Sequence, residues 1–99
     1  MDIPQESLNN VEKYADESRR GIFPVDAAAL YAIQLIIKYD NPDYIHTMPD
    51  NVKNAILEMI ETWKNKGAFI IYFDKGSADH SHLLAELTKK LDSKKQAPE

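Results

Sequence analysis

The stretch that decides the fold is residues 50–74, DNVKNAILEMIETWKNKGAFIIYFD, because it joins a helical pattern to a strand-like one through a single glycine. Apolar side chains in its first part recur every three or four residues, at Val52, Ala55, Ile56, Met59, Ile60 and Trp63. This spacing predicts an amphipathic helix with one wide apolar face. Gly67 stands where such a helix needs a left-handed residue to end. Upstream, Thr47 and Asp50 have the spacing of an N-terminal capping box.

Residues 68–73 lose the helical period and become continuously apolar, which is typical of a short buried strand. One strand cannot satisfy its own backbone N–H and C=O groups, so it needs a partner. Residues 44–48 and 22–23 are the internal candidates, and a second chain is the alternative. A homodimer through this strand edge therefore stays open, since a closed two-fold pair is the commonest oligomer.

Two helices are predicted before this stretch. The first covers residues 4–20, with Pro4 in its first turn and Gly21 after its end. The second begins after Pro24 and reaches about Tyr39. Because it is apolar around most of its circumference, we expect it to be the central helix against which the others pack.

The last helix is expected to begin at Ser77, after a turn at residues 75–76, and to reach about Leu91. The chain is thus expected to be mainly α, with four helices and one or two very short β-strands. A length of 99 residues suits one domain with one modest core. We assign residues 1–92 to that domain and residues 93–99 to a disordered polar tail.

The amino-acid composition excludes several classes of function. The chain has no cysteine, which excludes disulfide scaffolds, thiolate metal sites and cysteine nucleophiles. The first residues, MDIPQES, lack the basic and apolar regions of a secretory signal, and no apolar run is long enough to cross a bilayer. These features predict a cytoplasmic protein without membrane contact.

The charge is uneven along the chain. The net charge is −4, which argues against a general nucleic-acid binder. Residues 1–50 carry nine acidic and four basic side chains, a net −5, whereas residues 51–99 carry seven acidic and eight basic ones, a net +1. Ordinary solubility explains such a pattern, and so does an acidic surface for a basic partner.

We therefore predict a small acidic protein-binding module without enzymatic activity or a cofactor. Inhibitors and immunity proteins that mask a basic enzyme, such as a nuclease toxin, share these compositional properties. A structural homodimer without a ligand is a further alternative. The candidate contact residues of the acidic half are Glu12, Asp16, Asp40, Asp43, Tyr44 and Asp50.

Residues 79–82, Asp-His-Ser-His, indicate an alternative, a small metal-binding protein or enzyme. On a helix Asp79, His82 and Glu86 share a face and can supply nitrogen and oxygen ligands. His80 and His82, however, point about 200° apart on a helix, and no recognised metal motif is present. A polar first helical turn is the simpler interpretation, so no metal is predicted. The residues available to this alternative are His46, Asp79, His80, His82 and Glu86.

Two weaker patterns lie in the same region. Consecutive residues such as Asp79, His80 and Ser81 cannot form the hydrogen-bond relay of a hydrolase triad. Lys75-Gly76-Ser77, between a strand and a helix, can offer free N–H groups to an anion, but it lacks the phosphate-loop motifs. A plain turn and helix cap is the default interpretation there.

Overall fold

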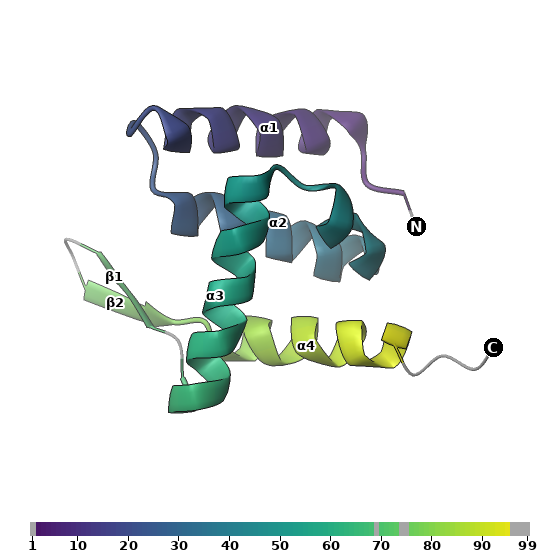
Figure 1. The fold of residues 1–99 in the computed structure, drawn as a ribbon, viewed down its shortest axis with the longest axis vertical. Coiled ribbons are helices and arrows are strands. Elements are labelled where there is room, and N and C mark those ends of the chain that lie inside the picture. Colours follow the sequence, from purple (N-terminus) through teal and green to yellow (C-terminus); the bar gives the residue numbers. More distant parts are fainter. Residues whose placement is uncertain (1, 69, 74–75, 96–99) are drawn as a thin grey trace.

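Four helices, a short 3-10 helix and one β-hairpin make up the fold (Figure 1). The computed structural model describes residues 2–68, 70–73 and 76–95, and for residues 71–73, 76–78 and 93–95 it describes the backbone alone. The elements in order are α1 (Gln5–Arg19), α2 (Val25–Tyr39), η1 (Pro42–Thr47), α3 (Asp50–Lys66), β1 (Ile70–Phe73), β2 (Gly76–Asp79) and α4 (Ser81–Lys95). The predicted class, mainly α with four helices and very short strands, is confirmed. None of the described helices has the length and apolar character needed to cross a membrane.

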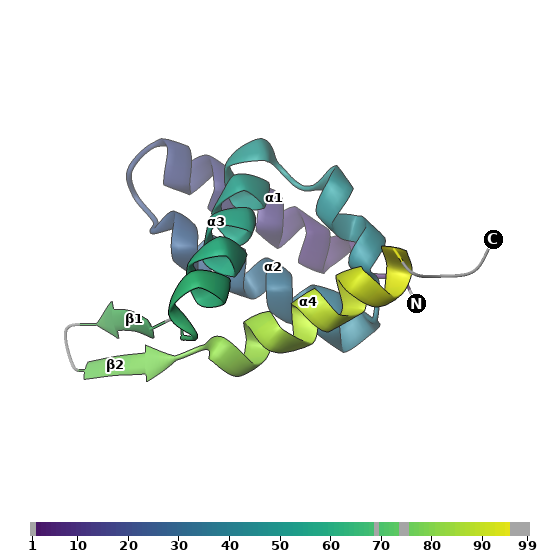
Figure 2. The same ribbon diagram turned by 60° about the horizontal axis from the view of Figure 1, so that its bottom comes forward.

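The central helix is α2, as its apolar circumference predicted. Its buried side chains are Ala28, Ala29, Leu30, Ala32, Ile33, Leu35 and Ile36. It packs against α1, α3, α4 and η1. Figures 1 and 2 show α1 on one side of α2 and α4 on the other, with α3 crossing in front. The small alanines allow this close approach, because they leave little side chain between the helices.

Prolines and left-handed residues set the ends of the first two helices. Pro4 and Pro24 occupy the positions just before α1 and α2. Gly21 follows α1 with φ 75°, and the N–H groups of Ile22 and Phe23 bond back to the carbonyl of Glu17. The predicted bounds of both helices agree with the structure.

The core face of α3 also agrees with the prediction. Val52, Ala55, Ile56 and Met59 are buried, whereas Ile60 and Trp63 are only half-buried. Gly67 ends the helix with φ 77°, and its N–H donates to the carbonyl of Trp63 at 2.7 Å.

The predicted capping box at the start of α3 is wrong. Pro49 is the N-cap residue of α3, and no side chain caps its N–H groups. Thr47 lies inside η1 instead, where its hydroxyl donates to the carbonyl of Tyr44 at 2.9 Å. The short turn of η1 therefore uses the hydroxyl that the sequence pattern assigned to α3.

The partner of the apolar strand differs from both internal candidates. β1 pairs antiparallel with β2, with Ile70 opposite Asp79 and Phe73 opposite Gly76. Residues 44–47 are in η1 and residues 22–23 form the connection between α1 and α2, so neither pairs with it. The turn and helix start predicted at residues 75–77 are also wrong over the described part, since Gly76 and Ser77 belong to β2. Lys75 lies outside the described residues. The hairpin extends away from the helices (Figure 2).

Helix α4 begins later and ends later than predicted. It starts at Ser81 and runs to Lys95, with Leu84 and Leu87 fully buried against the core. Residues 93–95 therefore continue the helix rather than belonging to the expected tail. Residues 96–99, the rest of that predicted tail, lie outside the described residues.

Candidate functional site

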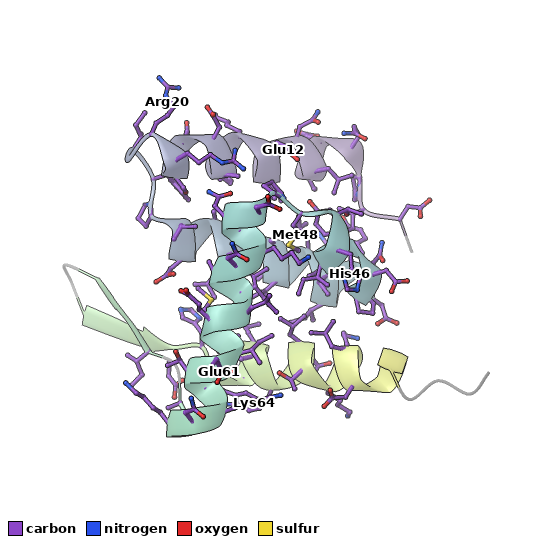
Figure 3. All side chains as sticks on the ribbon, viewed as in Figure 1. Glu12, Arg20, His46, Met48, Glu61 and Lys64 are labelled. Carbon is purple, nitrogen blue, oxygen red and sulfur yellow. The ribbon has the colours of Figure 1, made fainter. Side chains whose placement is uncertain are left out.

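The meeting point of α1, η1 and the first turn of α3 gathers most of the predicted contact residues. The side-chain amide of Asn51 donates to the carbonyl of Ala15 at 3.0 Å, which fixes the start of α3 against the middle of α1. Glu12 and Asp16 lie one turn apart on α1 and are exposed, and Asp50 is exposed beside Asn51. Figure 3 shows Glu12 on the side of α1 that faces the segment containing Met48, just before α3.

Tyr44 of η1 belongs to the same place. Its ring is half-buried and packs against the core. Burial raises the pKa of Tyr44 to about 12, and the nearby negative charge of Glu12 and the Tyr31 hydroxyl add to this rise. The hydroxyl of Tyr44 therefore stays protonated at physiological pH and can donate a hydrogen bond. We call the surface formed by Glu12, Asp16, Tyr44 and Asp50 the acidic junction.

The charges of the acidic junction are mostly uncompensated. Asp16 has an ion-pair partner, Arg20, at 3.7 Å, but both side chains are about two-thirds exposed, so solvent screens this pair. Glu12 and Asp50 form no ion pair with any of the described residues. Exposed carboxylates of this kind can receive the lysine or arginine side chains of a partner.

Asp40 and Asp43 lie outside the acidic junction. Asp40 is at the end of α2, where its carboxylate accepts a hydrogen bond from Nζ of Lys90 at 2.8 Å. This bond, together with the charge of Lys90, holds the pKa of Asp40 below its usual range. Asp43 lines a separate cavity between η1, α3 and α4. The sequence thus placed six residues on one surface, whereas the structure brings four of them together.

A separate feature is an open cavity of about 370 Å³ between η1, α3 and α4, which we call the η1–α3–α4 groove. Its lining residues are Pro42, Asp43, Ile45, His46, Lys53, Leu57, Ile60, Lys64, Thr88, Leu91 and Asp92. His46 and Lys64 both lie on the side of α3 that faces η1 and α4 (Figure 3). Sequence analysis missed this groove. The one residue that could have indicated the groove is Leu57, which is apolar, lies outside the core face of α3 and is 47% exposed.

The Asp-His-Ser-His segment does not form the metal face that a helix would give. Asp79 ends β2, so it does not share a helical face with His82 and Glu86. The amide and the hydroxyl of Ser81 both donate to Oδ1 of Asp79, and these bonds hold the pKa of Asp79 below its usual range. His80 is half-buried and His82 is exposed. Within the described residues, no three histidine, aspartate or glutamate side chains converge as metal ligands.

His46, the fifth residue of that alternative, lies on η1 at the groove, whereas the Asp-His-Ser-His segment lies between β2 and the first turn of α4. The direct bond between Ser81 and Asp79 leaves no imidazole between them, so the hydrogen-bond order of a hydrolase triad is absent from this segment. The Gly76-Ser77 part of the anion-binding pattern lies in a strand and not at a helix start.

No protein-family model, curated protein or solved structure matches the chain. The interpretation of both surfaces therefore depends on their own geometry and charge.

Proposed function

We propose that this protein is a small acidic protein-binding module that acts in the cytoplasm and masks a basic partner through the acidic junction. The observation that supports the proposal is a group of exposed acids, Glu12, Asp16 and Asp50, on α1 and the start of α3, which the bond from Asn51 to Ala15 holds together. Tyr44 lies near the charge of Glu12. Tyrosines are frequent among the residues that dominate interface energies, and rim charges steer association. An inhibitor or immunity protein that covers a basic enzyme, such as a nuclease toxin, uses a surface of this kind.

The supporting helices make the acidic junction suited to a preformed interface. Val11 and Ala15 of α1 and Val52 of α3, which neighbour the exposed acids in the sequence, are fully buried. Such a backbone orders little on binding, so the entropic cost of association is small. There are two alternatives, a metal-binding protein or enzyme using His80 and His82, and a homodimer without a ligand. Among the described residues, no comparable arrangement of side chains supports either one.

Affinity capture from a lysate of the native host, at low salt, tests the proposal. The bait is the full chain, compared with a Glu12→Lys/Asp50→Lys variant that reverses two charges of the acidic junction. Glu86→Lys serves as the matched control, because Glu86 is an exposed acid on α4 away from this surface. We expect a basic protein to be enriched by the wild type and by Glu86→Lys, but not by the double variant.

The urea midpoints of all three baits must be compared first, since a lysine in the first turn of α3 opposes the helix dipole. Equal recovery of every protein by the wild type and the folded double variant would refute the proposal. Capture of nothing at low salt would count against it equally.

A further inference from the structure

The side of α3 that faces away from α2 is a helix surface that the other helices leave uncovered. In Figure 1, α3 crosses in front of α2 and no described element lies over it. Leu57, in the middle of this 17-residue helix, is 47% exposed. Among the described residues, no other helix carries an exposed large apolar side chain. One exposed leucine is ordinary by itself, so the charges around Leu57 decide what covers it.

Charged side chains of opposite sign flank Leu57 symmetrically. Lys53 and Glu61 lie four residues before and after it, and Asp50 and Lys64 lie seven residues before and after it. All of them share the face of Leu57, because side chains four and seven residues apart lie on the same side of a helix. Figure 3 shows Glu61 and Lys64 toward the C-terminal end of α3. We call the surface formed by these five residues the α3 outer face.

The α3 outer face is complementary to itself when two copies of α3 run in opposite directions. A two-fold axis beside Leu57 places each residue opposite the one at the same distance on the other side of Leu57 in the second copy. Lys53 therefore meets Glu61 of the second copy, and Asp50 meets Lys64 of the second copy. In a parallel pair each residue would meet its own copy, and like charges would face each other. Since such charges set partner choice and orientation in helix pairs, the pattern favours an antiparallel second copy.

The charges of the α3 outer face are available for a second copy. Asp50, Lys53, Glu61 and Lys64 form no ion pair with any described residue. The η1–α3–α4 groove lies beside the same face, since Lys53, Leu57 and Lys64 are among its lining residues. The two lysines and two aspartates of the lining balance, and η1, α3 and α4 each add apolar side chains. A neutral apolar group, such as Leu57 of a second copy, suits this setting better than an ion.

We propose that the protein forms a weak two-fold dimer in which the α3 outer faces of two copies pack antiparallel, with Leu57 at the centre. A helix of this length measures about 25 Å, so the interface is at the small end of specific protein contacts and dissociates on dilution. Glu12 and Asp16 lie on α1, outside the paired face. Asp50 belongs to both surfaces, so a second copy and a basic partner would compete for this residue.

Sedimentation equilibrium of the full chain, from about 10 µM to about 1 mM, tests the proposal over the range in which small interfaces dissociate. The average mass of the wild type should rise from monomer toward dimer. Leu57→Glu should stay monomeric, because it places two carboxylates together at the two-fold axis. Glu58→Lys is the matched control, since Glu58 is exposed on α3 but points to another side of the helix. It should dimerise as the wild type does.

Charge reversals test the antiparallel register. Lys53→Glu and Glu61→Lys each place like charges opposite one another twice, because the two-fold axis repeats every contact. Each variant alone should self-associate about five- to thirtyfold more weakly than the wild type. An equimolar mixture of the two should pair at about wild-type strength, because the reversed charge of one variant meets the reversed charge of the other. Mixing would not repair damage to the fold of either variant.

Three outcomes would overturn the proposal. The first is a wild type that stays monomeric throughout this concentration range. The second is a Leu57→Glu variant that dimerises as strongly as the wild type, or amide shifts on dilution that centre on the hairpin, because either would place the second copy elsewhere. The third is a mixture of the two reversed variants that pairs no more tightly than each alone. None of these measurements uses a basic partner, so the proposed function keeps its own separate test.

Discussion

At the scale of single residues, Asp40 has two effects on stability at the end of α2. Its backbone is left-handed, with φ 49° and ψ 51°, and Asp is one of the few residues besides glycine that adopt this conformation readily. The N–H groups of Asp40 and Asn41 then bond to the carbonyls of Ile37 and Ile36. The carboxylate of Asp40 reaches across to Lys90 of α4. One residue therefore ends a helix and links it to another fifty positions away.

The Asp40–Lys90 pair predicts a pH-dependent contribution to stability. The Asp40→Asn variant measures this contribution separately from the effect of the left-handed backbone. Asparagine keeps the left-handed backbone but removes the charge. Because Lys90 lowers the pKa of Asp40 in the folded state, the contribution of this carboxylate is present above its ordinary pKa of 3.8 and is lost as pH falls through the lower folded value. Urea midpoints of wild type and variant should differ slightly at neutral pH and converge in acid.

The stabilisation from the Asp40–Lys90 pair is also lost at high pH. Asp40 raises the pKa of Lys90, so the stabilisation from Lys90 is present below its ordinary pKa of 10.5 and is lost as pH rises through the higher folded value. The difference between wild type and Asp40→Asn should therefore close at very high pH as well. A difference that is the same in acid as at neutral pH would show that the charge of Asp40 plays no part.

At the scale of elements, α3 presents different faces to the core, the groove and the solvent. Ile56 is fully buried against α2, Ile60 is half-buried at the groove, and Leu57 and Glu58 are exposed. The sequence pattern placed Ile56 and Ile60 on one buried stripe. The structure separates them, because α4 and η1 leave the groove open beside Ile60.

Alanine substitutions along α3 measure this arrangement. Ile56→Ala should lower the free energy of unfolding by about 2–5 kcal/mol, because it empties a packed site beneath α2. Ile60→Ala should cost less than Ile56→Ala, since part of the Ile60 side chain already faces the groove. Glu58→Ala should stay within about 0.5 kcal/mol. Equal urea midpoints for all three variants would show that the core face is wrongly assigned.

The hairpin gives the second prediction for an element. Because β1 pairs with β2 of the same chain, exchange of the amide hydrogens in this ladder should not depend on protein concentration. Ile71→Pro removes an N–H from β1 and should speed exchange in β2 as well. The described sheet has only these two strands, so the homodimer through a strand edge remains a prediction. Protection that rises with concentration, together with a dimer in sedimentation, would favour it.

These elements show how much of the fold can be predicted from the sequence. Pro4, Pro24 and Gly67 mark helix ends by local geometry alone, and the apolar periods of α2 and α3 identify their buried faces. Residues 76–79, Gly-Ser-Ala-Asp, have low strand propensity, so only pairing with β1 makes them a strand. The sequence predicted Ser77 as the start of the last helix, whereas the helix begins at Ser81, whose amide donates to Oδ1 of Asp79 at the end of β2.

The candidate sites depend more strongly on tertiary structure. The acidic residues were visible in the sequence, but the effect of the Glu12 charge on Tyr44 and the separation of Asp40 from them depend on how η1 and α4 pack. The groove is lined by three segments spread over fifty residues, which no local pattern connects.

At the scale of the whole molecule, the uneven charge of the sequence becomes a difference between surfaces. Most exposed acids of residues 1–50 lie on α1, η1 and the first turn of α3, with Asp26 on α2 and Asp40 at its end. The C-terminal helix α4 carries Lys89 and Lys90 together with Glu86 and Asp92. Figure 3 shows Glu12 and Lys64 at opposite ends of the molecule. If the protein binds a basic partner as proposed, such a distribution would orient that partner toward the acidic junction before contact.

The salt dependence of the association rate with the captured basic partner tests the central claim most directly. For the wild type and Glu86→Lys the rate should fall steeply as salt rises, because the charges are screened beyond about 8–10 Å at physiological ionic strength. For Glu12→Lys/Asp50→Lys the rate should be low throughout and nearly independent of salt. A wild-type rate that does not change with salt, or one that the double variant reproduces, would contradict binding through the acidic junction.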